Sequence, residues 1–159
     1  MISEKLVKAF NDQVVAEFWS SNLYLQMAFY LKKEGWNGSA NWMFKQAEEE
    51  KEHALKLADY AIKRGGEVKV GMIDVVPDGW GSLQDVFENV YEHECHVSKL
   101  IDDLAGVAEA ENDRATREFL NWFIREQVEE EDSALEIVER LKKAGEAGAF
   151  FVDAELAKR

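Results

Sequence analysis

Hydrophobic residues recur at steps of three and four along four long segments of the chain. In the first segment the repeat begins at Leu6 and continues to the neighbourhood of Gly35. A repeat near 3.6 residues places these side chains on one face of an α-helix. Ser3 is a suitable N-cap for this helix, and Gly35 is a suitable stop. The pattern therefore predicts a helix from Ser3 to Glu34.

Three further segments carry the same repeat. No proline or glycine interrupts residues 39–64. The next segment begins after Ser82, which with Asp85 suits N-terminal capping, and the fourth spans residues 114–143. A shorter apolar stretch, residues 149–157, follows two glycines. We therefore expect an all-α fold with four long helices and a short fifth C-terminal helix.

Residues 67–82 differ from the rest of the chain. They include Pro77, the only proline, and three glycines, and they have no helical repeat. A helix of about 28 residues is about 42 Å long at 1.5 Å per residue. A connection of about 17 residues extends to roughly 56 Å, which is enough to cross such a helix. We therefore expect a four-helix bundle with one long crossover between its second and third helices.

The composition is strongly acidic. Thirty-two Asp and Glu residues against nineteen Lys and Arg residues give a net charge of -13. This charge repels nucleic acid and anionic membranes and attracts cations. A length of 159 residues suits one domain, so we expect residues 1–159 to form a single domain.

Cysteine content and hydropathy bear on location. Cys95 is the only cysteine, which excludes an intrachain disulfide framework and fits a reducing compartment. The start of the chain lacks the apolar run of a signal peptide, and no stretch approaches the roughly 20 apolar residues of a membrane span. We expect a cytoplasmic protein that binds neither membrane nor nucleic acid.

A glutamate interrupts the hydrophobic stripe near the middle of each long helix. These four residues are Glu17, Glu50, Glu94 and Glu130. His53 follows Glu50 by three residues, and Gln127 precedes Glu130 by three, so each pair shares a helix face. A carboxylate is rarely buried unless it is paired or bound to a cation. Because all of these residues lie near helix midpoints, we expect them to meet at one level of the bundle.

The four carboxylates carry the charge that two divalent cations would balance. Oxygen ligands with one imidazole suit iron(II) or manganese, and the absence of thiolate ligands argues against structural zinc. With four long helices, a crossover and these inward glutamates, the chain resembles the ferritin family, specifically the non-haem bacterial-type ferritins, over nearly its whole length.

The resemblance implies a di-iron centre. Its implied ligands are Glu17, Glu50, His53, Glu94, Gln127 and Glu130. Glu17 and His53 would serve the first iron, Glu50 would bridge, and the other three would lie at the second iron. The Gln127-x-x-Glu130 pair replaces the Glu-x-x-His of symmetric di-iron enzymes. The second site would therefore bind iron more weakly than the first, which suits iron that passes through the centre.

Further residues gain a role only from the resemblance. Glu49, Glu126 and Glu129 match the carboxylates of a third iron site, although their positions off the stripe alone would place them toward solvent. Tyr24 and Trp122 match aromatic residues that give up an electron or a hydrogen bond beside the iron ions. Their positions alone favour ordinary core packing equally well.

The resemblance also implies the activity and the assembly. Fe(II) would be oxidised by dioxygen or hydrogen peroxide, which is ferroxidase activity, and Fe(III) would be stored as a hydrous oxide mineral. The store would be a hollow cage of 24 subunits, a homo-oligomer for which Trp36, Trp80 and Phe151 are candidate exposed aromatics. Lys51 occupies the position of the haem-ligating methionine of bacterioferritins, so we expect no haem.

Two alternatives remain open. A stand-alone di-iron oxidase or peroxidase of rubrerythrin type is less favoured, because the chain lacks a Cys-x-x-Cys motif and a second ligand histidine in the helix predicted for residues 114–143. A metal-free acidic helical module for protein partners leaves four inward glutamates unexplained. Two histidines, His93 and His96, flank Glu94 outside its stripe, and we expect both at the surface or at an interface.

Overall fold

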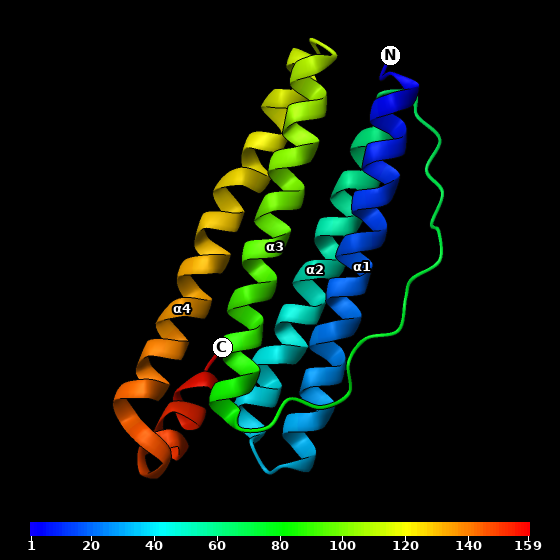
Figure 1. Ribbon diagram of the computed structural model, residues 1–159. Coiled ribbons are helices and arrows are strands. Elements are labelled where there is room, and N and C mark those ends of the chain that lie inside the picture. The colour runs from blue at the N-terminus through cyan, green and yellow to red at the C-terminus, as the bar shows by residue number, and fades with distance from the viewer.

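The computed structural model describes residues 1–159 as a bundle of four helices (Figure 1). The helices are α1 (Glu4–Lys33), α2 (Asn37–Lys63), α3 (Leu83–Ala110) and α4 (Arg114–Leu156). No strand is present. The expected all-α, four-helix bundle is therefore confirmed. No helix carries an apolar stretch of the length that a bilayer crossing requires.

Two helices begin where their local sequence predicts. The Ser3 hydroxyl accepts a hydrogen bond from the backbone N–H of Leu6 at 3.2 Å. At the start of α3, Ser82 and Asp85 form a reciprocal capping box. The Asp85 carboxylate accepts the Ser82 backbone N–H at 2.8 Å, and the Ser82 hydroxyl accepts the Asp85 N–H at 3.1 Å. Both N-cap predictions are confirmed. They could be made from the sequence because each cap lies within three residues of its partner.

The start of α2 is fixed by a distant residue. The helix begins at Asn37, two residues before the predicted Ser39, and Trp36 at its N-cap makes no side-chain capping bond. Asp153 of α4 instead accepts the backbone N–H of Ser39 at 2.7 Å and that of Gly38 at 3.3 Å. A carboxylate is favourable at this end of a helix, where N–H groups are unpaired. The contact of Asp153 with α2 therefore stabilises the start of this helix ahead of the predicted Ser39.

We expect Asp153→Ala to lower the melting temperature, because loss of an N-cap costs about 1 kcal/mol. Glu155→Ala is the matched control: it removes the same charge from the same segment, where the carboxylate bonds only to Lys158. Thermal unfolding followed by circular dichroism compares the two variants. Equal melting temperatures would contradict the capping role of Asp153.

The predicted fifth helix is joined to the fourth across a kink. The sequence predicts a helix that ends at Lys143 and a second one over 149–157; α4 spans Arg114–Leu156, and the non-helical residue Gly145 divides it into two helical segments. Gly145 has φ 66° and ψ -177°, a conformation that glycine adopts without steric penalty. In Figure 1 the segment after this kink folds back beside the end of the bundle. There, Val152 and Leu156 are buried in the core.

The connection between α2 and α3 follows the outside of α1. Figure 1 shows it passing from one end of the bundle to the other, so that α2 and α3 run in the same direction. Asn11 bonds to the backbone of Glu67 and Lys69, each at 3.1 Å. Near the other end, the Tyr30 hydroxyl donates to the Gly81 carbonyl at 2.6 Å. These polar contacts hold a segment that has no helical hydrogen bonds of its own.

The hydrophobic core is divided in two. Helix α1 packs most extensively on α2, and α3 on α4. On α3, Val90 belongs to one hydrophobic cluster and Val97 to the other, with Glu94 between them. The same break occurs on the other helices at the level of their inward glutamates. The fold therefore places a polar layer across the middle of the bundle.

Candidate metal centre

The polar layer contains buried polar and ionisable side chains from all four helices. Its members are Glu17 of α1, Glu50 and His53 of α2, Glu94 of α3, and Gln127 and Glu130 of α4. None of them is more than 7% exposed. The structure thus brings the six predicted central residues into one layer. Helical periodicity turns each of them inward, and their mid-helix positions put them at the same height.

Three sets of donor atoms lie close enough to hold a metal ion, each set within 4.8 Å. The first set is Glu17, Glu50 and His53, and the second is Glu50, Glu94 and Glu130. The third is His53, Glu126 and Glu130. Glu50 belongs to the first two sets. Two adjacent cation positions that share the Glu50 carboxylate are therefore possible.

Two carboxylate oxygens in this layer lack a hydrogen-bond partner. They are Oε2 of Glu17 and Oε2 of Glu50. The other oxygens accept hydrogen bonds from Gln13 at 3.0 Å and from Gln46 at 3.2 Å. His53 Nδ1 is 3.6 Å from Glu50 Oε2, too far for a good hydrogen bond. A buried oxygen without a partner is unfavourable, and a cation among these donors would supply one.

Burial raises the pKa of every carboxyl group in the layer. For Glu17 and Glu50, desolvation is the main cause of a pKa well above the ordinary value, and neighbouring carboxylates raise it further. Desolvation likewise raises the pKa values of Glu94 and Glu130 to about 7. Without a cation, the layer therefore retains protons near neutral pH. Metal ions would displace them, since a metal-bound carboxylate is deprotonated.

Three supporting residues escaped the sequence prediction. Gln46 donates to Glu50 at 3.2 Å and to Glu130 at 2.7 Å, so it connects α2 with α4. Gln13 holds Glu17, and Ser98 accepts from the Gln127 amide at 3.3 Å. A signal was available for two of them: Gln13 and Gln46 each precede an inward glutamate by four residues, which is the spacing of neighbours on one helix face.

Both predicted aromatic residues lie beside the layer. Tyr24 is fully buried, and its hydroxyl donates a hydrogen bond to Glu94 Oε1. Burial and the charge of Glu94 raise the pKa of Tyr24 well above its usual value. Trp122 is half-buried, with its ring centroid 5.5 Å from that of His53 in an edge-to-face arrangement. Each ring therefore contacts a residue that belongs to a donor set.

The three further carboxylates occupy different environments. Glu126 is half-buried and joins the third donor set. Glu49 is half-buried but forms an ion pair with Arg159 at 2.9 Å. Glu129 is exposed and belongs to no donor set. A cavity of about 320 Å³, here called the α2–α4 pocket, is lined by Glu49, Glu52, His53, Lys56, Trp122 and Glu126. The pocket reaches the centre at His53.

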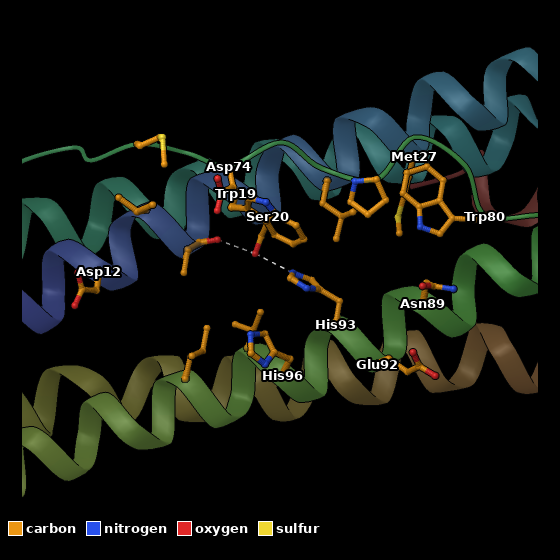
Figure 2. A pocket seen from close by; sticks show the side chains of 17 residues that line it. Asp12, Trp19, Ser20, Met27, Asp74, Trp80, Asn89, Glu92, His93 and His96 are labelled. Atoms are coloured by element: carbon orange, nitrogen blue, oxygen red, sulfur yellow. Dashed lines mark hydrogen bonds between the residues drawn. The ribbon is translucent and has the colours of Figure 1, made fainter.

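A larger pocket of about 560 Å³ lies between α1, α3 and the connection (Figure 2). Figure 2 shows His93 pointing toward Ser20, and the His93 Nε2 atom is 2.8 Å from the Ser20 hydroxyl. Its ring also packs on Trp19. Burial lowers the pKa of His93 to about 4. His93 is thus half-buried and His96 is exposed, where a position at the surface or at an interface is predicted for both.

Comparisons with known proteins agree with this architecture. The family model described as Ferritin-like domain matches residues 7–144. The bacterial non-heme ferritin of Bacteroides fragilis (strain 638R) is 59% identical over 159 residues, the full length of both chains. The bacterial non-heme ferritin of Escherichia coli O6:H1 is 31% identical over 99% of this chain and 96% of its own.

Among solved structures, the open pore ferritin from the hyperthermophilic archaeon Archaeoglobus fulgidus superposes with a TM-score of 0.98. It is 47% identical, and the match covers 100% of this chain and 99% of the archaeal one. The resemblance drawn from the inward glutamates is therefore confirmed at the level of the family. The chain belongs to the ferritin family.

Proposed function

We propose that this protein, as a single ferritin-like domain over residues 1–159, oxidises Fe(II) at the buried centre and stores the resulting Fe(III) as a mineral. The observation that carries the proposal is the convergence of four buried glutamates and His53 from all four helices. Two of their oxygens lack any partner within the protein. Membership of the ferritin family supports iron as the metal.

The donor sets divide the ligands between two iron ions. Glu17 and His53 serve the first ion, and Glu50 bridges because it belongs to both sets. Glu94 and Glu130 serve the second ion. Gln127 donates its amide to Glu94 at 3.2 Å, so it acts on the second site through that carboxylate. The first ion thus has an imidazole that the second lacks, which makes the two sites unequal.

The iron ions are the substrate of this reaction. Each of two Fe(II) ions loses one electron, and dioxygen takes both electrons with two protons to give hydrogen peroxide. If hydrogen peroxide is the oxidant, two electrons and two protons convert it into two water molecules. Four carboxylates neutralise two Fe(II) ions, and binding releases the protons that burial keeps on Glu94 and Glu130.

The α2–α4 pocket offers a route out of the centre. Glu126 is close to His53 and Glu130, and Glu49 lines the same pocket. We assign to Glu126, Glu49 and the exposed Glu129 the third iron position that the resemblance implies. Iron would then move from the weaker second site toward this position. Oxidised iron that stayed at the centre while mineral grew elsewhere would contradict this transit.

We further propose a homo-oligomer in the form of a 24-subunit cage, located in the cytoplasm and without haem. Several apolar side chains are exposed, as expected for surfaces that a second subunit covers. The most exposed include Met72 (83%), Val75 (91%), Phe150 (70%) and Phe151 (77%). Trp36 and Trp80 were expected among them but are half-buried: Trp36 packs on Phe150 and Trp80 on Tyr30.

Sedimentation after aerobic Fe(II) loading tests cage, oxidation and storage together. We expect one large species that sediments faster after loading and retains far more than two iron ions per chain. A dimer that holds about two iron ions per chain would favour the rubrerythrin-type oxidase instead. A protein that retains no iron would contradict the proposed function.

A further inference from the structure

Lys56 lies over the face of Trp122. Its ammonium nitrogen is 3.3 Å from the centroid of the indole ring. Glu52 and Glu126 line the same pocket, yet the ammonium rests on the ring. A cation is attracted to the negative face of an aromatic ring, most strongly for tryptophan. Both side chains are half-buried, so water screens this interaction only partly.

Trp122 links this lysine to the metal centre. The Trp122 ring meets the His53 ring edge to face, with an interplanar angle of 77°. His53 in turn belongs to two of the three donor sets. Lys56 is therefore separated from the centre by one aromatic ring, and it contacts no atom of the donor sets through hydrogen bonds or ion pairs.

A positive charge on the ring face opposes oxidation of that ring. When an indole gives up an electron, it becomes a radical cation, which a neighbouring ammonium repels. The same ammonium stabilises the neutral ring through the cation–π interaction. Burial lowers the pKa of Lys56, but the Glu126 carboxylate favours its charged form. Both effects of the ammonium make Trp122 a poorer electron donor.

Tyr24 has the opposite environment. Its ionisable neighbours are the carboxyl groups of Glu94, Glu50 and Glu130, which carry negative charge once a cation displaces their protons. The hydroxyl already donates to Glu94, which provides an acceptor for the proton that a tyrosine loses on oxidation. Carboxyl neighbours and a hydrogen-bonded proton acceptor favour removal of an electron from Tyr24, whereas the ammonium of Lys56 opposes it at Trp122. The two aromatic residues beside the centre are thus tuned in opposite directions.

We propose that Lys56 keeps Trp122 reduced and so leaves Tyr24 as the aromatic electron donor of the centre. Lys56 is a positioning residue in this role, because it acts on Trp122 and not on the iron. The consequence for iron oxidation rests on the proposed function. The effect of Lys56 on Trp122 does not, since it requires only the side chains of the metal-free protein.

The first experiment uses metal-free protein and the carbonate radical anion as oxidant. This radical takes one electron from the indole, which gives carbonate and the indole radical cation. The radical cation then loses its N–H proton to the carbonate, which gives hydrogencarbonate and a neutral tryptophyl radical. Peptide mass spectrometry follows the loss of unmodified Trp122, with the other four of the five tryptophans as internal references. The variants are Lys56→Met, Lys56→Arg and the control Lys45→Met, which removes an exposed charge from the same helix.

We expect Lys56→Met to lose Trp122 about fivefold to tenfold faster than the native protein. Lys56→Arg, which keeps a cation on the ring, should restore the native rate, and Lys45→Met should match it. Because the oxidant is an anion, removal of a lysine cannot accelerate the reaction by attracting it. Equal rates in all proteins, or acceleration in Lys56→Arg as well, would overturn the proposal.

The second experiment repeats the comparison during aerobic addition of Fe(II). Per iron oxidised, Lys56→Met should accumulate about fivefold more oxidised Trp122 than the native protein. Equal accumulation would overturn the protective role of Lys56 during turnover. Absence of iron oxidation in every protein would contradict the proposed function instead, and the metal-free result would still decide whether Lys56 protects Trp122.

Discussion

Replacing Glu50 or His53 with alanine is expected to abolish fast iron oxidation while the fold and the assembly survive. Glu50 belongs to both donor sets assigned to the two proposed iron positions, so its loss would remove the proposed bridge and one carboxylate from each. His53 supplies the only imidazole of the first donor set. We expect the initial rate to fall at least about 100-fold in either variant, more than is lost with an outer-shell residue. Stopped-flow absorbance of Fe(III) after aerobic mixing measures this rate.

Glu48→Ala is the matched control for Glu50→Ala. Glu48 is exposed, lies two residues away on the same helix, belongs to no donor set and does not line the α2–α4 pocket. This variant should oxidise iron at close to the native rate. The metal-free Glu50→Ala protein should melt no lower than the native one, because it loses a buried carboxyl group with an unpartnered oxygen. Native oxidation rates in both Glu50→Ala and His53→Ala would refute the assignment.

The metal-free protein is expected to lose stability as the pH rises from about 4.5 toward 7. Glu94 and Glu130 have pKa values of about 7 in the folded chain, against a usual 4.5. Between these values the folded state holds protons that the unfolded state has released, so the free energy of unfolding falls with pH. Each group contributes at most about 3 kcal/mol to this loss.

Melting temperatures at pH 5.5 and pH 8 measure this dependence. The double variant Glu94→Gln, Glu130→Gln should show a weaker decrease, because its amides cannot ionise. The net charge of -13 also opposes folding at high pH, but nearly the whole of that charge is common to both proteins. An equal decrease in the two proteins would show that the buried pair does not titrate as described.

Binding of a divalent cation should reverse the loss of stability that the metal-free protein shows as the pH rises. Co(II) at 100 times its dissociation constant should stabilise the folded state by about 2.7 kcal/mol. At one fixed Co(II) concentration the gain should be larger at pH 8 than at pH 5.5, because protons compete with the metal for Glu94 and Glu130 and weaken its binding at the lower pH. The double variant should gain less. If Co(II) left the melting temperature of the native protein unchanged, the metal-free acidic module would be the better interpretation.

The sequence by itself determined which faces of the helices are buried and which polar residues share them. Helical periodicity is a local property, so Glu17, Glu50, Glu94 and Glu130 could be placed inward without coordinates. Their position near each midpoint also predicted a common level, and the structure places them there. The caps at Ser3 and Ser82 were equally predictable, because each involves residues within one helical turn.

Contacts between residues far apart in the sequence were decided only by the tertiary structure. Asp153 of α4 accepts the backbone N–H of Ser39 at the start of α2, and Arg159 pairs with Glu49. No local sequence pattern links either pair of residues. The placement of Lys56 on Trp122 is of the same kind. Periodicity fixes which face of a helix is buried, whereas the rotation and axial offset of neighbouring helices decide which side chains meet. Those two quantities exist only once the helices have packed.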